Sequence, residues 1–231
     1  MTLKRELQLW NQEKWEDKNQ AMYEQFKENR WPWYSDALDP DIGQFMETVV
    51  REKIDILDLG TCSGSQAIEL AKLGHRVVGT DISATALAQA ELAAARETGL
   101  TLRFRLDDIT SSGLAEDQFD LVLDRGCYHS IWSFNHAEYV AGVQRVLKPG
   151  GVLLLKTMSS DETRFIAYDT IGGKQVQMPC HFPKEDLRGL LAPHFDILKM
   201  SDSYFYSSVV DPPARARLVV LRNRKPPRAA G

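Results

Sequence analysis

Residues 54–83 read IDILDLGTCSGSQAIELAKLGHRVVGTDIS, and this stretch decides the fold. The apolar run at 54–59 is typical of a strand buried on both faces of a parallel sheet. Residues 60–64 make a turn of small residues, and 65–73 repeat apolar side chains at helical spacing. Residues 75–81 form a second apolar run that ends in an acid. We therefore expect a strand, a turn, a helix and a second strand, arranged as one βαβ unit.

The acid that ends the second predicted strand indicates the ligand. Asp81 lies 21 positions after Gly60, and a carboxylate at this place in such a unit can accept both hydroxyls of a ribose. The backbone amides of 60–64 and the start of the following helix offer a surface for that ligand. The stretch therefore predicts a nucleoside-binding unit. A βαβ unit that holds no ligand is the structural alternative.

The glycine spacing distinguishes between nucleoside ligands. A dinucleotide fingerprint requires G-x-G-x-x-G, but its third position here is Cys62 and its sixth is Gln66. What remains is D-x-G-x-x-x-G from Asp58 to Gly64, which resembles motif I of the class I S-adenosylmethionine-dependent methyltransferases. In that family the loop wraps the methionine part of the cofactor, and the resemblance implies that Asp81 takes the ribose.

Cys62 departs from the family pattern, because this position is usually glycine in those enzymes. A left-handed backbone at Cys62 would cost about 1 to 2 kcal/mol of strain. We expect instead that the turn simply tolerates a small side chain.

Length and composition narrow the class of protein. The chain has 231 residues, 43% of them hydrophobic, which suits one α/β domain with a substantial core. A net charge of −4 argues against a nucleic-acid partner and favours a small molecule. Three separated cysteines, no export signal and no membrane-length apolar run predict a soluble, cytoplasmic protein, monomeric or homodimeric.

Aromatic residues gather ahead of the first strand. A polar, helical leader is expected over residues 2–29, followed by Trp31, Trp33 and Tyr34 and a helix at about 41–51. We expect the leader to cap the cofactor cleft, with these three aromatics lining the substrate pocket and facing the sulfonium cation. A hydrophobic clasp for the leader is the alternative. Such leaders are similar to those of thiopurine and thiol methyltransferases.

Further polar residues follow the third and fourth predicted strands. Ser83 is expected to cap a helix that extends to about residue 95, and a third strand is expected at 102–109. By the resemblance, Asp108 matches the acceptor of the adenine amino group and Ile109 the residue whose backbone meets the ring. A solvated acid is the alternative for Asp108.

The loop after the fourth strand holds the candidate catalytic residues. The run 124–126, Asp-Arg-Gly, resembles the segment after strand four in thiopurine S-methyltransferases, and Tyr128 and His129 follow it. With an ordinary pKa of about 6.5, His129 is suited to take a proton from a thiol, amine or hydroxyl acceptor. The alternative is a structural histidine. Asp124 suits an anchor for the cofactor or lid as well as a role on the substrate.

The remaining chain completes the predicted fold. A tight turn at 148–151 leads to a fifth strand at 152–157 and an insertion at 158–182, whose Arg164 we place near the substrate. A helix at 183–191 precedes an antiparallel hairpin of strands at 195–205 and 215–222. Residues 224–231 are expected to be a flexible basic tail. The pairs at 127–129 and 180–181 lack the spacing of zinc ligands, so no metal is expected.

We therefore predict a single Rossmann-like, doubly wound domain with a seven-stranded, mostly parallel sheet, in which 1–50 form a helical lid and 51–223 the core. The resemblance implies methyl transfer from S-adenosylmethionine to a small molecule, a soft acceptor such as a thiol favoured, with S-adenosylhomocysteine as product. A nicotinamide-dependent oxidoreductase and a non-catalytic nucleoside-binding module are the alternatives. The cofactor residues are expected to be Asp58, Gly60, Thr61, Cys62, Ser63, Gly64, Asp81, Ile82, Asp108, Ile109, Asp124 and Arg125. The catalytic residues are expected to be His129, Asp124 and Tyr128, and the substrate residues Trp31, Trp33, Tyr34, Tyr128, His129 and Arg164.

Overall fold

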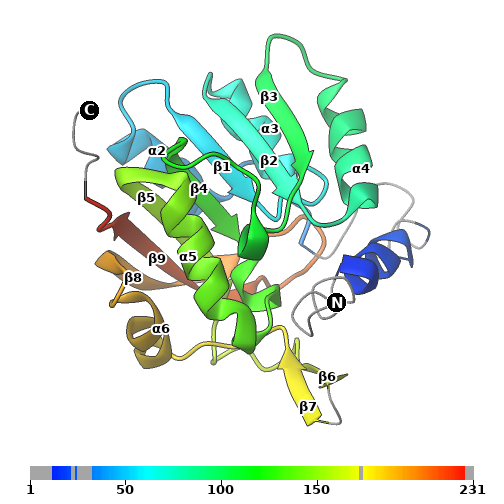
Figure 1. Cartoon of the computed structure of the whole chain (residues 1–231). Coiled ribbons are helices and arrows are strands. Elements are labelled where there is room, and N and C mark those ends of the chain that lie inside the picture. Colours follow the sequence, from blue (N-terminus) through cyan, green and yellow to red (C-terminus); the bar gives the residue numbers. More distant parts are fainter. Residues whose placement is uncertain (1–11, 22–23, 25–32, 172–173, 227–231) are drawn as a thin grey trace.

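A twisted seven-stranded sheet forms the centre of the molecule in the computed structural model, which describes residues 12–21, 24, 33–171 and 174–226 (Figure 1). Its strand order is β3-β2-β1-β4-β5-β9-β8. The strands are β1 Asp55–Leu59, β2 Arg76–Asp81, β3 Thr101–Leu106, β4 Phe119–Arg125, β5 Leu147–Met158, β8 Phe195–Phe205 and β9 Ala214–Asn223. Strand β9 is antiparallel to both of its neighbours, and the first five strands are mutually parallel. The predicted fold class is confirmed.

Helices cover both faces of this sheet. On one face lie α2 Pro40–Val49, α3 Ser65–Lys72 and α4 Ala84–Ala94, and on the other lie α5 His136–Val146 and α6 Lys184–Leu191. The arrangement follows from right-handed crossovers, since the chain winds outward from β1 to β3 and then returns to β4. Two apolar clusters result, one under α2 and α3 and one under α5 and α6.

Local residue choices set the helix ends around the central unit. The Ser83 hydroxyl accepts a hydrogen bond from the Ala86 amide at 3.1 Å, which confirms the predicted N-cap of α4. Helix α3 ends at Lys72, and Gly74 follows with φ +91°, a left-handed conformation that favours glycine.

Strand β5 begins earlier than predicted. Residues 148–151 lie inside β5 rather than in a separate turn, and the pairing of β4 with β5 shifts register between Phe119 and Leu121. Gly150 has φ +74°, and the registered pairing of β5 with β4 passes from Leu147 to Val152, so residues 148–151 form an irregularity at the start of the strand. The predicted insertion at 158–182 contains a hairpin, β6 Ala167–Ile171 and β7 Lys174–Met178.

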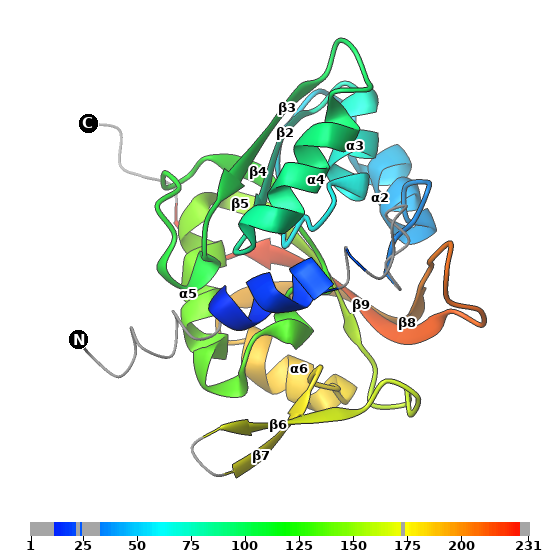
Figure 2. The ribbon, with the colours of Figure 1, turned by 90° about the vertical axis from the view of Figure 1, so that its right-hand side faces the viewer.

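The described part of the N-terminal leader is a helix at residues 12–21. Its Glu16 carboxylate accepts hydrogen bonds from the Ser83 hydroxyl at 2.7 Å and the Thr85 amide at 3.2 Å. Figure 2 shows this helix beside the start of α4, across the edge where the parallel strands end. Trp31 and the rest of the predicted leader lie outside the described residues.

The end of β9 is tied down by charges. The Arg224 guanidinium pairs with Asp196 at 2.7 Å, and the Lys225 ammonium pairs with Asp117 at 2.7 Å. Residues 224 and 225 of the predicted tail thus form ion pairs with neighbouring elements, and residues 227–231 lie outside the description. In the described part of the chain, none of the helices combines the length and apolar character needed to cross a membrane.

Candidate functional site

The carboxyl ends of β1, β2 and β4 meet at one edge of the sheet. The strand order reverses between β1 and β4, and such a reversal opens a crevice outside the strand ends where ligands bind in open α/β sheets. The loop 60–64 leaves β1 at this point and leads directly into α3. The topology thus brings the predicted cofactor loop and the loop after β4 together.

Three left-handed residues shape the loop 60–64. Gly60 has φ +69°, Cys62 φ +49° and Gly64 φ +77°. A Cβ placed on Gly60 would lie 2.8 Å from the Cβ of Cys127, so only glycine lets β1 approach the loop after β4. The expectation that Cys62 avoids the left-handed region is wrong. Its amide donates to the Asp81 carboxylate at 2.9 Å, a contact that the left-handed backbone permits.

Asp58 anchors the start of this loop. Its side chain is buried, and its Oδ2 accepts a hydrogen bond from the Thr61 hydroxyl at 2.6 Å. Burial raises the pKa of Asp58 to about 6. The Thr61 amide in turn donates to the Thr80 carbonyl at 2.8 Å, which ties the loop to the end of β2. Ser63 is also buried within the loop.

Asp81 closes the far side of the loop. Its two oxygens accept one amide each, from Cys62 at 2.9 Å and from Ser83 at 3.0 Å. Burial raises the pKa of Asp81, although its side chain keeps some contact with solvent. A carboxylate has about four lone-pair positions, so Asp81 retains acceptor capacity for two hydroxyl groups, and Ile82 follows it at the same edge.

The residues after β3 adopt a short capped turn. The Asp108 Oδ1 atom accepts from the amide and the hydroxyl of Thr110, at 2.9 and 2.7 Å, and caps the 3-10 helix Ile109–Ser111. Ile109 is buried, and its carbonyl lies close to Gly142 of α5, where an added Cβ would clash with it. Asp108 and Ile109 lie next to the end of β2, because the Asp107 amide donates to the Asp81 carbonyl at 3.1 Å.

Asp124 is a structural anchor rather than a catalytic group. It is fully buried, and its carboxylate accepts from the amides of residues 126, 127 and 128 and, at 2.6 Å, from the Tyr139 hydroxyl. Burial raises its pKa to about 7. The predictions of Asp124 as a catalytic and cofactor-binding residue are wrong, because four donors occupy its oxygens and no surface of it faces the crevice.

Tyr128 is a core residue. Its side chain is fully buried, and its ring packs against His136, Tyr139 and Phe182 with centroid separations of 4.5, 4.7 and 5.1 Å. The predicted catalytic and substrate-binding roles of Tyr128 are therefore wrong. The sequence places it beside His129, but the 3-10 helix Tyr128–Ser130 turns the two side chains to different surroundings.

His129 lies at the edge but is not the predicted base. Its Nδ1 accepts a hydrogen bond from the Met158 amide at 3.1 Å. Burial, followed by the positive charges of His181, Lys18 and Arg125, lowers its pKa to about 3. The prediction of proton removal assumed an ordinary pKa, and with Nδ1 occupied and the pKa lowered His129 is a weaker base than that prediction assumed.

Trp33 and Tyr34 lie against the predicted cofactor loop. The Trp33 indole N–H points at the Cys62 sulfur, 3.3 Å away. Both aromatics line a recess with the loop 60–64, Gln66 and Arg125, and the recess has a volume of about 30 Å³, room for one or two water molecules. The Lys18 ammonium lies 5.7 Å from the Trp33 ring centroid, so the N-terminal helix contacts the same aromatic.

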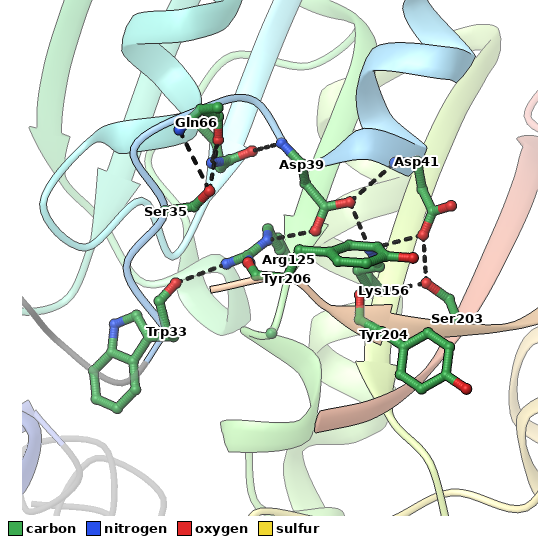
Figure 3. Close-up of polar contacts among 12 residues, drawn as sticks. Trp33, Ser35, Asp39, Asp41, Gln66, Arg125, Lys156, Ser203, Tyr204 and Tyr206 are labelled. Carbon is green, nitrogen blue, oxygen red and sulfur yellow. Dashed lines mark hydrogen bonds and ion pairs between the residues drawn. The ribbon is translucent and has the colours of Figure 1, made fainter. Parts of the chain in front are cut away.

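A buried cluster of charges holds the segment before α2 in place (Figure 3). Asp39 is fully buried and pairs with Arg125 at 3.0 Å and with Lys156 at 2.5 Å. Lys156, also fully buried, pairs with Asp41 at 2.8 Å, and the Ser203 hydroxyl donates to the same carboxylate. This charge cluster joins α2, β4, β5 and β8, and the sequence analysis did not find it. Lys156 lies in an otherwise apolar strand, and only the helix-capping position of Asp39 gave a local sign of a role.

Arg125 uses its donors within the protein. Its guanidinium donates to Asp39, to the Trp33 carbonyl at 3.0 Å and to the Tyr206 carbonyl. It therefore lines the recess and fixes two neighbouring segments, while its charge is balanced by Asp39.

Arg164 does not reach the site. It forms a two-pronged ion pair with Glu162 and donates to the carbonyls of Pro212 and Pro213 at 2.9 and 3.1 Å. The predicted substrate contact is wrong, because these bonds hold Arg164 between the insertion and the loop that joins β8 to β9. Among the described residues, no group of three or more His, Cys, Asp and Glu side chains is arranged to hold a metal ion.

Known proteins resemble this chain in sequence. Residues 56–151 match the family model described as a methyltransferase domain. An uncharacterized methyltransferase of Schizosaccharomyces pombe is 31% identical over 105 residues, which cover 46% of this chain and 72% of that protein. A ubiquinone biosynthesis O-methyltransferase of Cereibacter sphaeroides is 27% identical over 125 residues, which cover 54% of this chain and 49% of that protein.

Solved structures resemble the fold. The 1,6-didemethyltoxoflavin-N1-methyltransferase of Burkholderia thailandensis, crystallised with 1,6-didemethyltoxoflavin and S-adenosylhomocysteine, matches with a TM-score of 0.66 at 20% identity. The match covers 90% of this chain and 87% of that one. At this identity the similarity shows the fold alone.

Proposed function

The chain belongs to the class I S-adenosylmethionine-dependent methyltransferases, and on that premise we propose that it methylates a small-molecule nucleophile at the edge formed by β1, β2 and β4. We propose further that a thiol or other soft acceptor is favoured over an amine or a hydroxyl. The acceptor preference is supported by the resemblance of the leader and of residues 124–126 to thiopurine and thiol methyltransferases.

The residues at the edge fit the cofactor. Asp81 has the acceptor capacity that two ribose hydroxyls require, and the left-handed loop from Gly60 to Gly64 exposes main chain where a side chain would otherwise stand. We propose that Asp108 and the main-chain amide of Ile109 hold the adenine. When bound, the cofactor supplies a methyl group on a positively charged sulfur, which is already a reactive electrophile. The combination of this loop with Asp81 is the observation that carries the proposal.

The acids of the loop complement the cofactor's positive charge. Asp58 and Asp81 lie within one loop of each other, joined through Thr61 and Cys62. Burial raises the pKa of both carboxyls, and a neighbouring cation would lower those pKa values again. We propose that cofactor binding and ionisation of these two carboxyls reinforce each other.

The recess beside the loop 60–64 bears on how the cofactor enters. The recess between Trp33 and the loop has a volume of about 30 Å³. This volume is far too small for the methionine part of the cofactor. We propose that the segment ahead of Asp39 swings outward to admit the cofactor and returns to exclude water, while the charge cluster keeps its base fixed. The chain's remaining task is to align the acceptor and to keep solvent out, which are large contributions to a displacement reaction.

Product formation tests the proposal. The full chain is incubated with S-adenosylmethionine and a panel of thiols, amines and phenols, and S-adenosylhomocysteine is measured by mass spectrometry. We expect it to appear with at least one thiol. Methylation of amines alone would contradict the acceptor preference, and no product with any acceptor together with no cofactor binding would contradict the site.

A further inference from the structure

A main-chain hydrogen bond sets the tautomer of the His129 imidazole. Its Nδ1 accepts from the Met158 amide at 3.1 Å. A neutral imidazole carries one proton, so when Nδ1 accepts a hydrogen bond the proton resides on Nε2. Within the described chain, the bond from Met158 is the one hydrogen bond that this side chain makes. The Nε2–H group is therefore left for a ligand.

The ring of His129 is held in one orientation. Phe205 meets it edge to face, with centroids 5.3 Å apart at 88°. A Cβ on Gly126 would lie 3.0 Å from Cε1 and 3.4 Å from Nε2 of this ring. The nitrogen-bearing edge thus lies directly over the main chain at Gly126, and Cys127 next to it touches Gly60 of the cofactor loop. Residues 126 and 127 therefore lie between His129 and Gly60 of the loop 60–64.

Groups from three other parts of the chain act electrostatically on this ring. The charged groups that act on it are Lys18 from the N-terminal helix, Arg125 at the end of β4 and His181 ahead of α6. The acidic groups of the site, Asp58 and Asp81, lie on the other side of Gly60, in the cofactor loop. Lys18 therefore brings positive charge to the His129 side of the edge, while the charge of Arg125 is balanced by Asp39.

Two neighbours of His129, Asp124 and Tyr128, are not available as proton acceptors. The carboxylate of Asp124 already accepts four hydrogen bonds, and Tyr128 is buried in the core. A neutral acceptor has to lose a proton during transfer. At His129 it would meet an N–H group and nearby positive charge, and neither of these can take up that proton. An acceptor that is already an anion would find a hydrogen-bond donor and favourable charge.

We propose that His129 donates its Nε2–H to the methyl acceptor, and that this acceptor is an anion at neutral pH: an acidic thiol, or a phenol or enol of similar acidity, which loses its proton to solvent before it binds. This inference rests on the proposed function and specifies its substrate class. The acceptor's lone pair forms the new bond to the methyl carbon, the bond from that carbon to sulfur breaks, and its electron pair stays on the sulfur. No proton is released in the site. His129 positions the anion and holds its lone pair, so it is a binding residue and not a base.

The tautomer can be tested without any methyl transfer. The full chain, labelled with 15N at histidine, is followed by NMR from about pH 8 to about pH 5, and His129→Gln identifies the signal by its loss. We expect the His129 ring to remain neutral with its proton on Nε2 over this range. A ring that gains a proton near pH 6.5, or that carries its proton on Nδ1, would overturn the inference while leaving the methyltransferase proposal intact.

The acceptor class is tested with matched substrates and variants. Para-nitrothiophenol, which is ionised at neutral pH, is compared with benzyl mercaptan, which is not, using wild type, His129→Gln and His129→Phe. We expect kcat/KM to follow the ionised fraction of each thiol, so that the profile against pH bends at the thiol's own pKa. His129→Gln retains an N–H donor and is expected to stay within about threefold of wild type, whereas His129→Phe should lose about 10- to 100-fold.

Three experimental outcomes would contradict this proposal. Equal losses in His129→Gln and His129→Phe would make the residue a packing element. A pH profile that bends at the same value for both thiols would indicate a group on the protein that removes the proton. Methylation of neutral amines with none of acidic thiols or phenols would exclude the anionic class. Calorimetry with S-adenosylhomocysteine, expected to be the same in all three proteins, shows whether a loss lies in acceptor handling or in the cofactor site.

Discussion

Left-handed backbone at Gly60, Cys62 and Gly64 gives the cofactor loop its shape. For Cys62 this conformation costs about 1 to 2 kcal/mol, because a Cβ crowds the following carbonyl. Its hydrogen bond to Asp81 and the Trp33 indole N–H directed at its sulfur offset part of this strain. Strain that persists in a loop with such partners is typical of functional sites.

Gly60 is expected to be irreplaceable. Gly60→Ala adds a Cβ 2.8 Å from the Cβ of Cys127 in a left-handed backbone, so we expect about 2 to 4 kcal/mol less stability and loss of cofactor binding. Gly74→Ala is the matched control, because Gly74 has φ +91° and nothing within 4 Å; it should lose about 1 to 2 kcal/mol and keep binding. Urea unfolding and calorimetry measure both. Equal losses of stability and binding in the two variants would show that the close approach of Gly60 to Cys127 is not the cause.

The neutral state of His129 makes stability depend on pH. Its pKa is lowered from 6.5 to about 3, so between these values the unfolded chain binds a proton that the folded chain does not. The His129 contribution therefore rises with pH across this window. From about pH 7 to pH 5 wild type should lose about 2 kcal/mol more than His129→Gln. The other titrating carboxyls, Asp58 and Asp124 among them, are present in both proteins, so urea unfolding at each pH isolates the effect. Parallel pH dependences would show that His129 is protonated in the folded state.

At the scale of elements, the segment before α2 has contacts with the rest of the molecule at both of its described ends. The charge cluster of Asp39, Arg125, Lys156 and Asp41 holds its carboxyl end, while Trp33 rests on the cofactor loop. A buried ion pair contributes little net stability compared with apolar packing, but removing one partner leaves a charge uncompensated. We therefore interpret the charge cluster as fixing the position of the segment before α2 rather than as a source of net stability.

Asp39 should tolerate no truncation. Asp39→Ala leaves the buried cations Arg125 and Lys156 without their shared carboxylate, and we expect a loss of about 3 to 5 kcal/mol in the free energy of unfolding. Glu185→Ala removes an exposed acid of α6 and should change stability by less than about 0.5 kcal/mol. Thermal and urea unfolding compare them. A loss below about 1 kcal/mol for Asp39→Ala would mean that water reaches the cluster.

The N-terminal helix is expected to act on turnover more than on folding. It is held at the edge through Glu16 and through Lys18 on Trp33. Deletion of residues 1–34 leaves the charge cluster and both apolar clusters intact, so we expect a folded core that binds acceptor and cofactor too loosely for transfer. Circular dichroism and an assay of S-adenosylhomocysteine formation are the measurements. Normal kinetic constants in the truncated protein would contradict the lid.

For the molecule as a whole, patterns that are local in sequence were enough to predict the fold. Several predicted features depend only on spacing and on turn residues within one element. The structure contains them: the unit at 54–83, the Ser83 cap and the strand at Phe195–Phe205. The site was harder to predict, because its chemistry depends on burial and on distant partners. Asp124 follows an apolar strand in a manner that suits catalysis, yet Tyr139 from α5 and three amides fill its oxygens.

His129 shows the same limit. Its neighbours in sequence give no sign that the Met158 amide of β5 would bind its Nδ1, and that one bond converts a predicted base into a donor. Lys156 likewise reads as an interruption of an apolar strand until Asp39, 117 positions earlier, is brought beside it by the fold. The roles of such residues depend on contacts between elements that lie far apart in the sequence.

The central claim is that the edge of β1 and β2 holds S-adenosylmethionine through Asp81. Isothermal titration calorimetry with S-adenosylhomocysteine tests it on wild type and Asp81→Ala, with Glu185→Ala as the control. We predict one site per chain, a loss of about 1 to 3 kcal/mol of binding free energy in Asp81→Ala, since ribose hydroxyls lose their acceptor, and no change in the control. No binding to wild type, or equal affinity in wild type and Asp81→Ala, would contradict the account.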